Sequence, residues 1–211
     1  MIKRIFLTSS VSRVAGDIAK KIGGAKNKKI LYIYTAGDKQ RDEKWQKDDR
    51  KALVKAGFEV IDYTIVGKTK DTIQKDLKKV DIVYFGGGNV FYLLEQIQQT
   101  KCASVIRDFV NSGKIYIGTS AGSIVAGPDI YPVYILDKVK KAPKLKGYKG
   151  LGLVDFVIFP HWGSDHFRER YLNQRLENNY NLKNKLVLLN DYQYIQIEDD
   201  WLKIIEVKHN K

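Results

Sequence analysis

The segment Lys114-Ile-Tyr-Ile-Gly118-Thr-Ser120-Ala-Gly122-Ser123 decides the fold of this chain. It matches the pattern Gly-x-Ser-x-Gly, with an apolar, strand-like run before the first glycine and a run of small residues after the second. A strand, a tight turn and a helix in this order form the setting that a nucleophile elbow requires. The turn strains the serine backbone and places the hydroxyl at a helix N-terminus, where the helix dipole favours developing negative charge. Ser120 is therefore our candidate nucleophile, and the alternative is a Gly/Ser turn that only caps the helix.

A second glycine-rich turn, Phe85-Gly-Gly-Gly88-Asn89, follows the preceding apolar run. Backbone amides of this turn, beside the amide of Ala121, are suited to form an oxyanion hole. A phosphate cradle is a weaker interpretation, because the turn lacks Gly-x-Gly-x-x-Gly and no Gly-Lys-Ser/Thr follows it. The remaining alternative is a plain strand-to-helix turn.

A serine nucleophile needs a base, and the candidates are the chain's 3 histidines. His161 follows the apolar run Val157–Phe159, so we expect it beyond the carboxyl end of a strand, where the active groups of an open parallel sheet gather. His166 lies further on, in a polar segment that we expect to be helical, and His209 lies near the C-terminus, where we expect it to be solvated. We therefore favour His161 as the base, with His166 as the alternative.

The third member of such an apparatus is a carboxylate that orients the imidazole and stabilises its cation. Asp191 follows the apolar run Leu186–Leu189 and comes after the nucleophile and the base in the chain, so it is our first candidate. Glu198 is the main alternative, with Asp129 and Asp137 behind it.

Short apolar runs alternate along the chain with longer amphipathic segments. The short runs are rich in β-branched and aromatic residues and are bounded by turn residues, which predicts strands at Ile5–Thr8, Ile30–Tyr34, Glu59–Tyr63, Ile82–Phe85 and Lys114–Ile117. Between them, apolar residues recur at helical spacing, as at Val14, Ile18 and Ile22. This alternation predicts an α/β fold, a mainly parallel sheet with helices on both faces.

The last third of the chain has a different pattern. Strand-like runs at Leu186–Leu189, Tyr192–Ile197 and Trp201–Val207 are separated by short polar turns, which predicts antiparallel C-terminal strands. Residues Asp137–Gly152 are rich in Lys, Gly and Pro and lack a helical period, so we expect a long loop of the kind that is usually functional or mobile. Since no repeat or linker interrupts the chain, we expect a single domain over residues 1–211.

The composition limits the class of protein and its partners. The net charge of +13 raises nucleic acid as a partner, but the lysines are scattered and no aromatic stripe accompanies them, so we expect a solvated surface and no nucleic acid. One cysteine, Cys102, excludes an internal disulfide and points to a reducing compartment. No apolar run reaches the roughly 18–20 residues of a membrane span, and we expect a cytoplasmic protein. We expect no metal or other cofactor, because no His/Cys/carboxylate cluster has ligand spacing.

Four pieces of the sequence together resemble a known family. They are Phe85-Gly-Gly-Gly-Asn89, Gly118-Thr-Ser-Ala-Gly-Ser123, Gly150-Leu-Gly-Leu-Val154 and Phe159-Pro-His161. In this order they resemble the serine peptidase family that holds aspartyl dipeptidase (dipeptidase E) and cyanophycinase. The resemblance spans most of the chain, and it implies a flavodoxin-like α/β fold similar to that of the class I glutamine amidotransferases, with a serine in place of the cysteine.

The resemblance also implies roles for single residues. Ser120 falls on the family's nucleophile, His161 on its base and Gly88 on its oxyanion-hole amide, whereas Asp191 falls near the acidic member, where the similarity is weaker. The implied activity is hydrolysis of short peptides, with Asp-Xaa dipeptides as the expected substrates. The alternatives are another serine amide or ester hydrolase, such as a cyanophycinase-like peptidase, and a non-catalytic basic binding module.

In aspartyl dipeptidase, a basic side chain downstream of the histidine is expected to hold the substrate's aspartate. The matching candidates here are Arg175 first, then Arg170 and Arg168, all in the helix expected after His161. Asn89, at the end of the glycine-rich turn, is a further expected substrate contact. The oligomeric state stays open.

Overall fold

The computed structural model describes residues 2–38, 44–134, 139–180 and 183–208. Within these residues the strands are β1 (Arg4–Thr8), β2 (Lys29–Ile33), β3 (Glu59–Tyr63), β4 (Ile82–Phe85), β5 (Ile115–Thr119), β6 (Phe156–Phe159), β7 (Lys185–Leu188), β8 (Gln193–Glu198) and β9 (Trp201–Glu206). The α-helices are α1 (Val11–Lys21), α2 (Lys44–Lys55), α3 (Lys70–Leu77), α4 (Val90–Thr100), α5 (Ala103–Asn111), α6 (Ala121–Val125), α7 (Asp165–Arg170) and α8 (Leu176–Asn179). A π-helix, η4 (Tyr171–Arg175), joins α7 to α8, and three 3-10 turns are η1 (Thr35–Gly37), η2 (Tyr131–Val133) and η3 (Val139–Lys141).

The described strands form one large sheet and one small one. The large sheet has seven strands in the order β3-β2-β4-β5-β1-β8-β9. Pairing is parallel from β3 to β1, and β8 and β9 add antiparallel strands at one edge. The predicted mainly parallel sheet with antiparallel C-terminal strands is therefore confirmed, and the predicted strands agree with the observed ones to within a residue or two.

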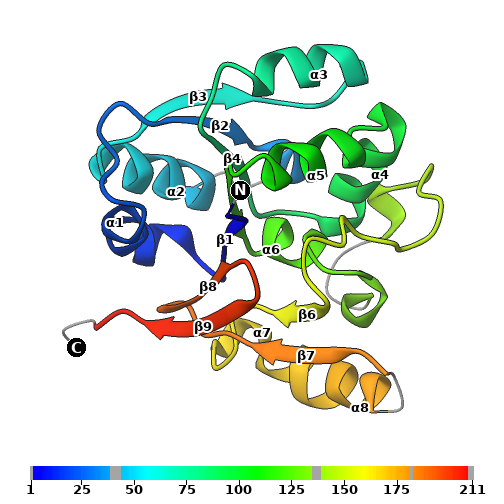
Figure 1. Cartoon of the computed structure of the whole chain (residues 1–211). Coiled ribbons are helices and arrows are strands. Elements are labelled where there is room, and N and C mark those ends of the chain that lie inside the picture. The colour runs from blue at the N-terminus through cyan, green and yellow to red at the C-terminus, as the bar shows by residue number, and fades with distance from the viewer. Residues whose placement is uncertain (1, 39–43, 135–138, 181–182, 209–211) are drawn as a thin grey trace.

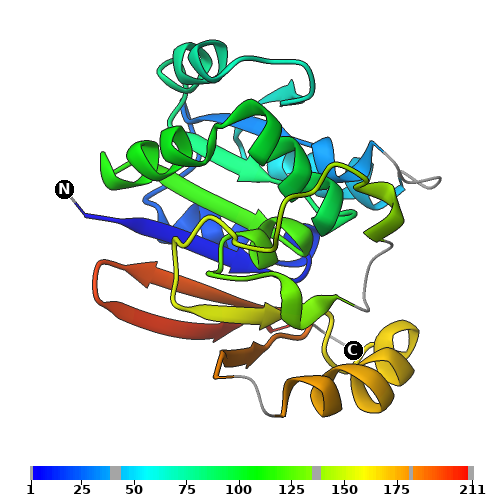
Figure 2. The same ribbon diagram turned by 90° about the vertical axis from the view of Figure 1, so that its right-hand side faces the viewer.

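One part of the strand prediction is wrong. The run at Leu186–Leu189 does not join the antiparallel strands, because β7 pairs parallel with β6 in a separate two-stranded sheet. Figure 2 shows these two strands near the β8–β9 hairpin of the large sheet, with the helical segment α7–α8 beside them. The apolar run correctly predicts a strand, but its partner lies about thirty residues earlier in the chain and cannot be identified from a local pattern.

Helices cover both faces of the large sheet, as Figure 1 shows. On one face, α1 and α2 pack their apolar sides on side chains such as Phe6, Tyr32 and Tyr84. On the other face, helices α3 to α6 pack on Leu7, Phe85 and their neighbours. No helix in the described part of the chain is both long enough and apolar enough to span a bilayer.

The described part of the long basic loop is fixed to the body of the protein. The side chain of Glu95 on α4 accepts the amide of Lys144, and the side chain of Gln98 on the same helix bonds the amide and the carbonyl of Lys146. Further on, Leu151 donates its amide to the carbonyl of Val125. These bonds hold the described loop backbone against α4 and α6.

Candidate active site

Ser120 lies in the tight turn between β5 and α6. Its backbone has φ 47° and ψ −109°, a left-handed conformation that costs energy for a residue with a side chain. The amide of Ser120 donates to the carbonyl of Thr8, and its carbonyl accepts the amides of Ser123 and Ile124, so both sides of the turn are held. Ser120 thus has the strained backbone that is expected of a nucleophile elbow.

The glycines around Ser120 are required by close packing. A Cβ added to Gly118 would lie 2.7 Å from the carbonyl oxygen of Gly122. A Cβ added to Gly122 would collide with the carbonyl of Phe85 on the neighbouring strand. The Gly-x-Ser-x-Gly pattern therefore lets α6 start directly against β4 and β5.

His161 and Asp191 complete a hydrogen-bonded chain with Ser120. His161 Nε2 lies 3.1 Å from Ser120 Oγ, and His161 Nδ1 lies 2.6 Å from Asp191 Oδ1. The side chains of His161 and Asp191 are 21% and 38% exposed, so solvent and substrate can approach the site. This order of contacts suits a tautomer in which Nδ1–H donates to the carboxylate and Nε2 accepts the serine proton.

The second glycine-rich turn lies directly beside the serine. A Cβ added to Gly87 would lie 3.3 Å from Ser120 Cβ and 3.3 Å from the ring of Trp45. Gly88 has φ 130°, and the amide of the next residue, Asn89, donates to the carbonyl of Ala36 at 2.8 Å. Ala121 is the first residue of α6, where a backbone amide has no acceptor within the helix. The structure thus brings both predicted oxyanion-hole segments next to Ser120.

The other predicted acids and bases lie elsewhere. His166 is exposed on α7, with its ring edge-on to Phe167. Glu198 pairs with Arg4 at the amino end of β1, whereas Ser120 follows the carboxyl end of β5, so Glu198 lies at the opposite end of the sheet. Asp129 accepts the amide of Tyr131. Asp137 and His209 lie outside the described residues.

The predicted substrate arginines differ in their accessibility. The side chain of Arg175 is 1% exposed, with its guanidinium carbon 4.4 Å from the ring centre of Tyr171, so substrate cannot touch it in this conformation. Arg170 is exposed and lies over the ring of Phe167, which stacks on the ring of His161. Arg170 is therefore an accessible arginine that contacts the ring stacked on the candidate base.

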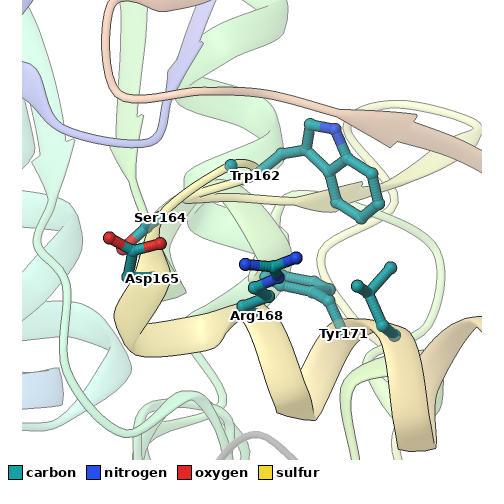
Figure 3. Close-up of a pocket in the computed structure, with 7 residues that line it drawn as sticks. Trp162, Ser164, Asp165, Arg168 and Tyr171 are labelled. Carbon is teal, nitrogen blue, oxygen red and sulfur yellow. The ribbon is translucent and has the colours of Figure 1, made fainter.

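Arg168 projects into a neighbouring cavity of about 250 Å³. Figure 3 shows its guanidinium between Trp162 and Tyr171, with Ser164 and Asp165 at the start of α7. The lining does not include Ser120 or His161. This cavity therefore lies next to the candidate catalytic residues but does not contain them.

Asn89 has a clear structural role. Its side chain is buried, and Oδ1 accepts the amide of Tyr92 at 2.8 Å, which makes Asn89 the N-cap of α4. This cap fixes the start of the helix that follows the glycine-rich turn. The predicted substrate contact by Asn89 stays a prediction.

Two side chains near the site carry no recognisable signal in the sequence. Ser9 follows β1, and its hydroxyl accepts the amide of His161 and donates to the carbonyl of Leu189, two residues before Asp191. Trp45, at the start of α2, lies against the glycine-rich turn. Both contacts join segments far apart in the chain, which a single sequence without an aligned family cannot reveal.

A buried carboxyl group lies behind the site. Asp49 on α2 accepts the amide of Ser12 and the hydroxyl of Tyr84, and Tyr84 belongs to the strand that leads into the glycine-rich turn. Burial raises the pKa of Asp49 to about 6, against the opposing effect of these hydrogen bonds. Among the described residues, no three His, Cys, Asp or Glu side chains gather as a metal site would require.

Comparison with known proteins assigns the chain to a family. The model of peptidase family S51 matches residues 5–205. An uncharacterized peptidase of Listeria innocua is 30% identical over 94% of each chain, and peptidase E of a Nostoc species is 30% identical over 77% of this chain and 66% of its own. The crystal structure of a peptidase E-type protein from Listeria monocytogenes superposes with a TM-score of 0.91 at 27% identity, covering 99% of this chain and 100% of the other. The chain therefore belongs to peptidase family S51 and is a serine peptidase.

Proposed function

We propose that this peptidase hydrolyses short peptides with Ser120 as nucleophile, His161 as base and Asp191 as the orienting carboxylate. The observation that carries the proposal is the continuous contact from Ser120 Oγ through the imidazole to Asp191 Oδ1, at 3.1 Å and 2.6 Å. The strained backbone of Ser120 supports the same role, because it holds the hydroxyl at the start of α6.

In the first half of the reaction, Ser120 Oγ attacks the substrate carbonyl while His161 Nε2 takes its proton. The carbonyl oxygen becomes an oxyanion, which accepts hydrogen bonds from the amides of Gly88 and Ala121. His161 then gives the proton to the leaving amine, and the acyl group remains on Ser120. In the second half, water attacks the acyl-enzyme with His161 again as base, and Ser120 is released.

For the substrate, we propose a preference for an acidic residue beside the scissile bond, as in Asp-Xaa dipeptides. Arg170 supports this preference, because it is exposed and its guanidinium lies over the ring of Phe167, which in turn stacks on the imidazole of His161. Arg175 lies behind Tyr171 and would reach a substrate only after the π-helix Tyr171–Arg175 moved. We also propose that residues 1–211 form one domain, in a reducing compartment such as the cytoplasm given the single cysteine.

Covalent labelling tests the proposed nucleophile. A serine-directed fluorophosphonate should label the wild type and should not label Ser120→Ala. Ser123→Ala is the matched control, because Ser123 lies three residues away on α6 and its hydroxyl is buried and bonded to the backbone of Thr8. Labelling that persists in Ser120→Ala would contradict the assignment of Ser120 as nucleophile. A loss of labelling seen only in Ser123→Ala would contradict it as well.

A panel of substrates tests the reaction class. The wild type should cleave dipeptides, with Asp-Xaa ahead of the isosteric Asn-Xaa, and should leave a folded protein intact. Faster cleavage of simple esters or non-peptide amides than of any dipeptide would contradict a peptide substrate while leaving Ser120 as the nucleophile.

A further inference from the structure

The catalytic residues of the proposed function come from two different sheets. Ser120 follows β5 of the seven-stranded sheet, whereas His161 and Asp191 follow β6 and β7 of the two-stranded sheet. Hydrogen bonds within a sheet fix the strands of that sheet relative to one another but not to those of the other sheet. The 3.1 Å contact between His161 and Ser120 therefore depends on what holds the two sheets together at this end.

One buried hydroxyl makes this connection. Ser9 directly follows β1, which is paired with β5 throughout its length, and its side chain is 1% exposed. Ser9 Oγ accepts the backbone amide of His161 at 3.1 Å and donates to the carbonyl of Leu189 at 2.8 Å. Leu189 lies two residues before Asp191, so the same oxygen contacts both the base and the segment that carries the acid.

The backbone around His161 depends on such support. His161 has φ 61°, a left-handed conformation that a histidine adopts only when its surroundings hold it. The amide of His161 donates to Ser9 Oγ. The amide of the next residue, Trp162, donates at 2.9 Å to the Leu189 carbonyl, which also accepts the Ser9 hydroxyl. Ser9, His161 and Leu189 thus form a closed set of bonds that sets the direction of the imidazole.

We propose that Ser9 is a positioning residue of the peptidase: its hydroxyl sets the small sheet relative to the large one, and so holds His161 in reach of both Ser120 and Asp191. The inference rests on the proposed roles of Ser120 and His161. Ser9 does not touch the imidazole ring, and it contributes to catalysis only through the two backbone segments that it bonds.

The proposal predicts a specific kinetic effect. Ser9→Ala should lower kcat about 10–100-fold, the range found for lost supporting contacts around reactive groups, and should leave KM within about twofold. The rate should fall because the base is displaced, while the residues that face the substrate stay in place. Ser9→Cys keeps a similar shape with only weak hydrogen bonding, so its kcat should fall between those of the alanine variant and the wild type.

Ser123→Ala is again a matched control. Ser123 Oγ is equally buried and makes two backbone bonds, to the amide of Thr8 at 2.9 Å and to its carbonyl at 2.7 Å. The variant loses as many hydrogen bonds as Ser9→Ala. The Thr8 carbonyl still accepts the Ser120 amide in this variant. The amide of His161 also keeps its bond to Ser9. The two alanine variants should therefore lose similar thermal stability, whereas Ser9→Ala should lose much more kcat.

A spectroscopic readout separates positioning from a general loss of stability. Proton NMR should show the low-field resonance of the His161 Nδ1–H, bonded at 2.6 Å to Asp191, in the wild type and in Ser123→Ala, and should show it shifted or broadened in Ser9→Ala.

The outcomes distinguish failure of this inference from failure of the proposed function. Equal kcat values and equal NMR spectra in Ser9→Ala and Ser123→Ala, with Ser120→Ala unlabelled by fluorophosphonate, would overturn the role of Ser9 alone. Continued labelling of Ser120→Ala would overturn the proposed function itself. If Ser9→Ala does not fold, the Ser9→Cys variant decides by the same comparison of kcat and of the NMR resonance.

Discussion

Replacing Asp49 by asparagine should stabilise the protein at neutral pH, although the carboxylate accepts two hydrogen bonds. Asp49 is 4% exposed, and burial raises its pKa from the ordinary 3.8 to about 6. The folded protein therefore binds this proton more tightly than the unfolded chain does. The resulting contribution to the free energy of unfolding is fully present below about pH 4 and is lost as the pH rises through about 6.

The size of the effect follows from the two pKa values. They differ by about two units, and each unit corresponds to about 1.4 kcal/mol, so ionisation of Asp49 removes roughly 3 kcal/mol by pH 7.5. Asparagine stays neutral at every pH. Its oxygen can accept the Ser12 amide, and its NH₂ group can donate to the hydroxyl oxygen of Tyr84 once that hydroxyl turns. The difference in unfolding free energy, Asp49→Asn minus wild type, should therefore grow by about 3 kcal/mol between pH 4 and pH 7.5.

Urea unfolding of both proteins across this pH range measures the difference directly. Taking the difference cancels the titration of groups that the two proteins share. Asp48→Asn, which makes the same substitution at an exposed position of the same helix, is the matched control. A difference for Asp49→Asn that varied by less than about 1 kcal/mol, or that shrank as the pH rose, would refute the burial argument.

Four further substitutions test the site. Gly88→Ala should lower kcat about 10²–10³-fold, because the added Cβ collides with the backbone of Ala36 and turns an oxyanion-hole amide away. Gly67→Ala is the control: Gly67 also has a positive φ but lies in open space, so this variant should leave the steady-state kinetics unchanged. Asp191→Asn should lower kcat by about 10⁴-fold by favouring the wrong imidazole tautomer, and a near-normal rate would move the acid elsewhere. Arg170→Ala should remove a preference of about 10–150-fold for Asp-Xaa over Asn-Xaa, the value of a charge-assisted contact of about 1.5–3 kcal/mol. Arg175→Ala should instead lower the Tm, because that side chain is buried; loss of the preference in this variant alone would mean that the helix opens to expose it.

The sequence alone determined the features whose causes are local. The strand before Gly118, the turn at Ser120 and the helix after it depend on adjacent residues, because strand alternation and glycine spacing are short-range requirements. The alternation of strands and helices likewise predicts the parallel sheet. The apolar runs before His161 and Asp191 predict that each residue follows a strand, although both of these strands lie in the second sheet.

Other features were decided only by tertiary packing. An apolar run shows that β7 is a strand but does not show that it pairs with β6 instead of β8. The burial of Arg175 under Tyr171 follows from how the helix docks, although the sequence predicts Arg175 as the first candidate for binding substrate. The bonds from Ser9 to His161 and Leu189 join residues more than 150 positions apart. Such contacts have no sequence period, because they depend on the three-dimensional arrangement of elements that each form for local reasons.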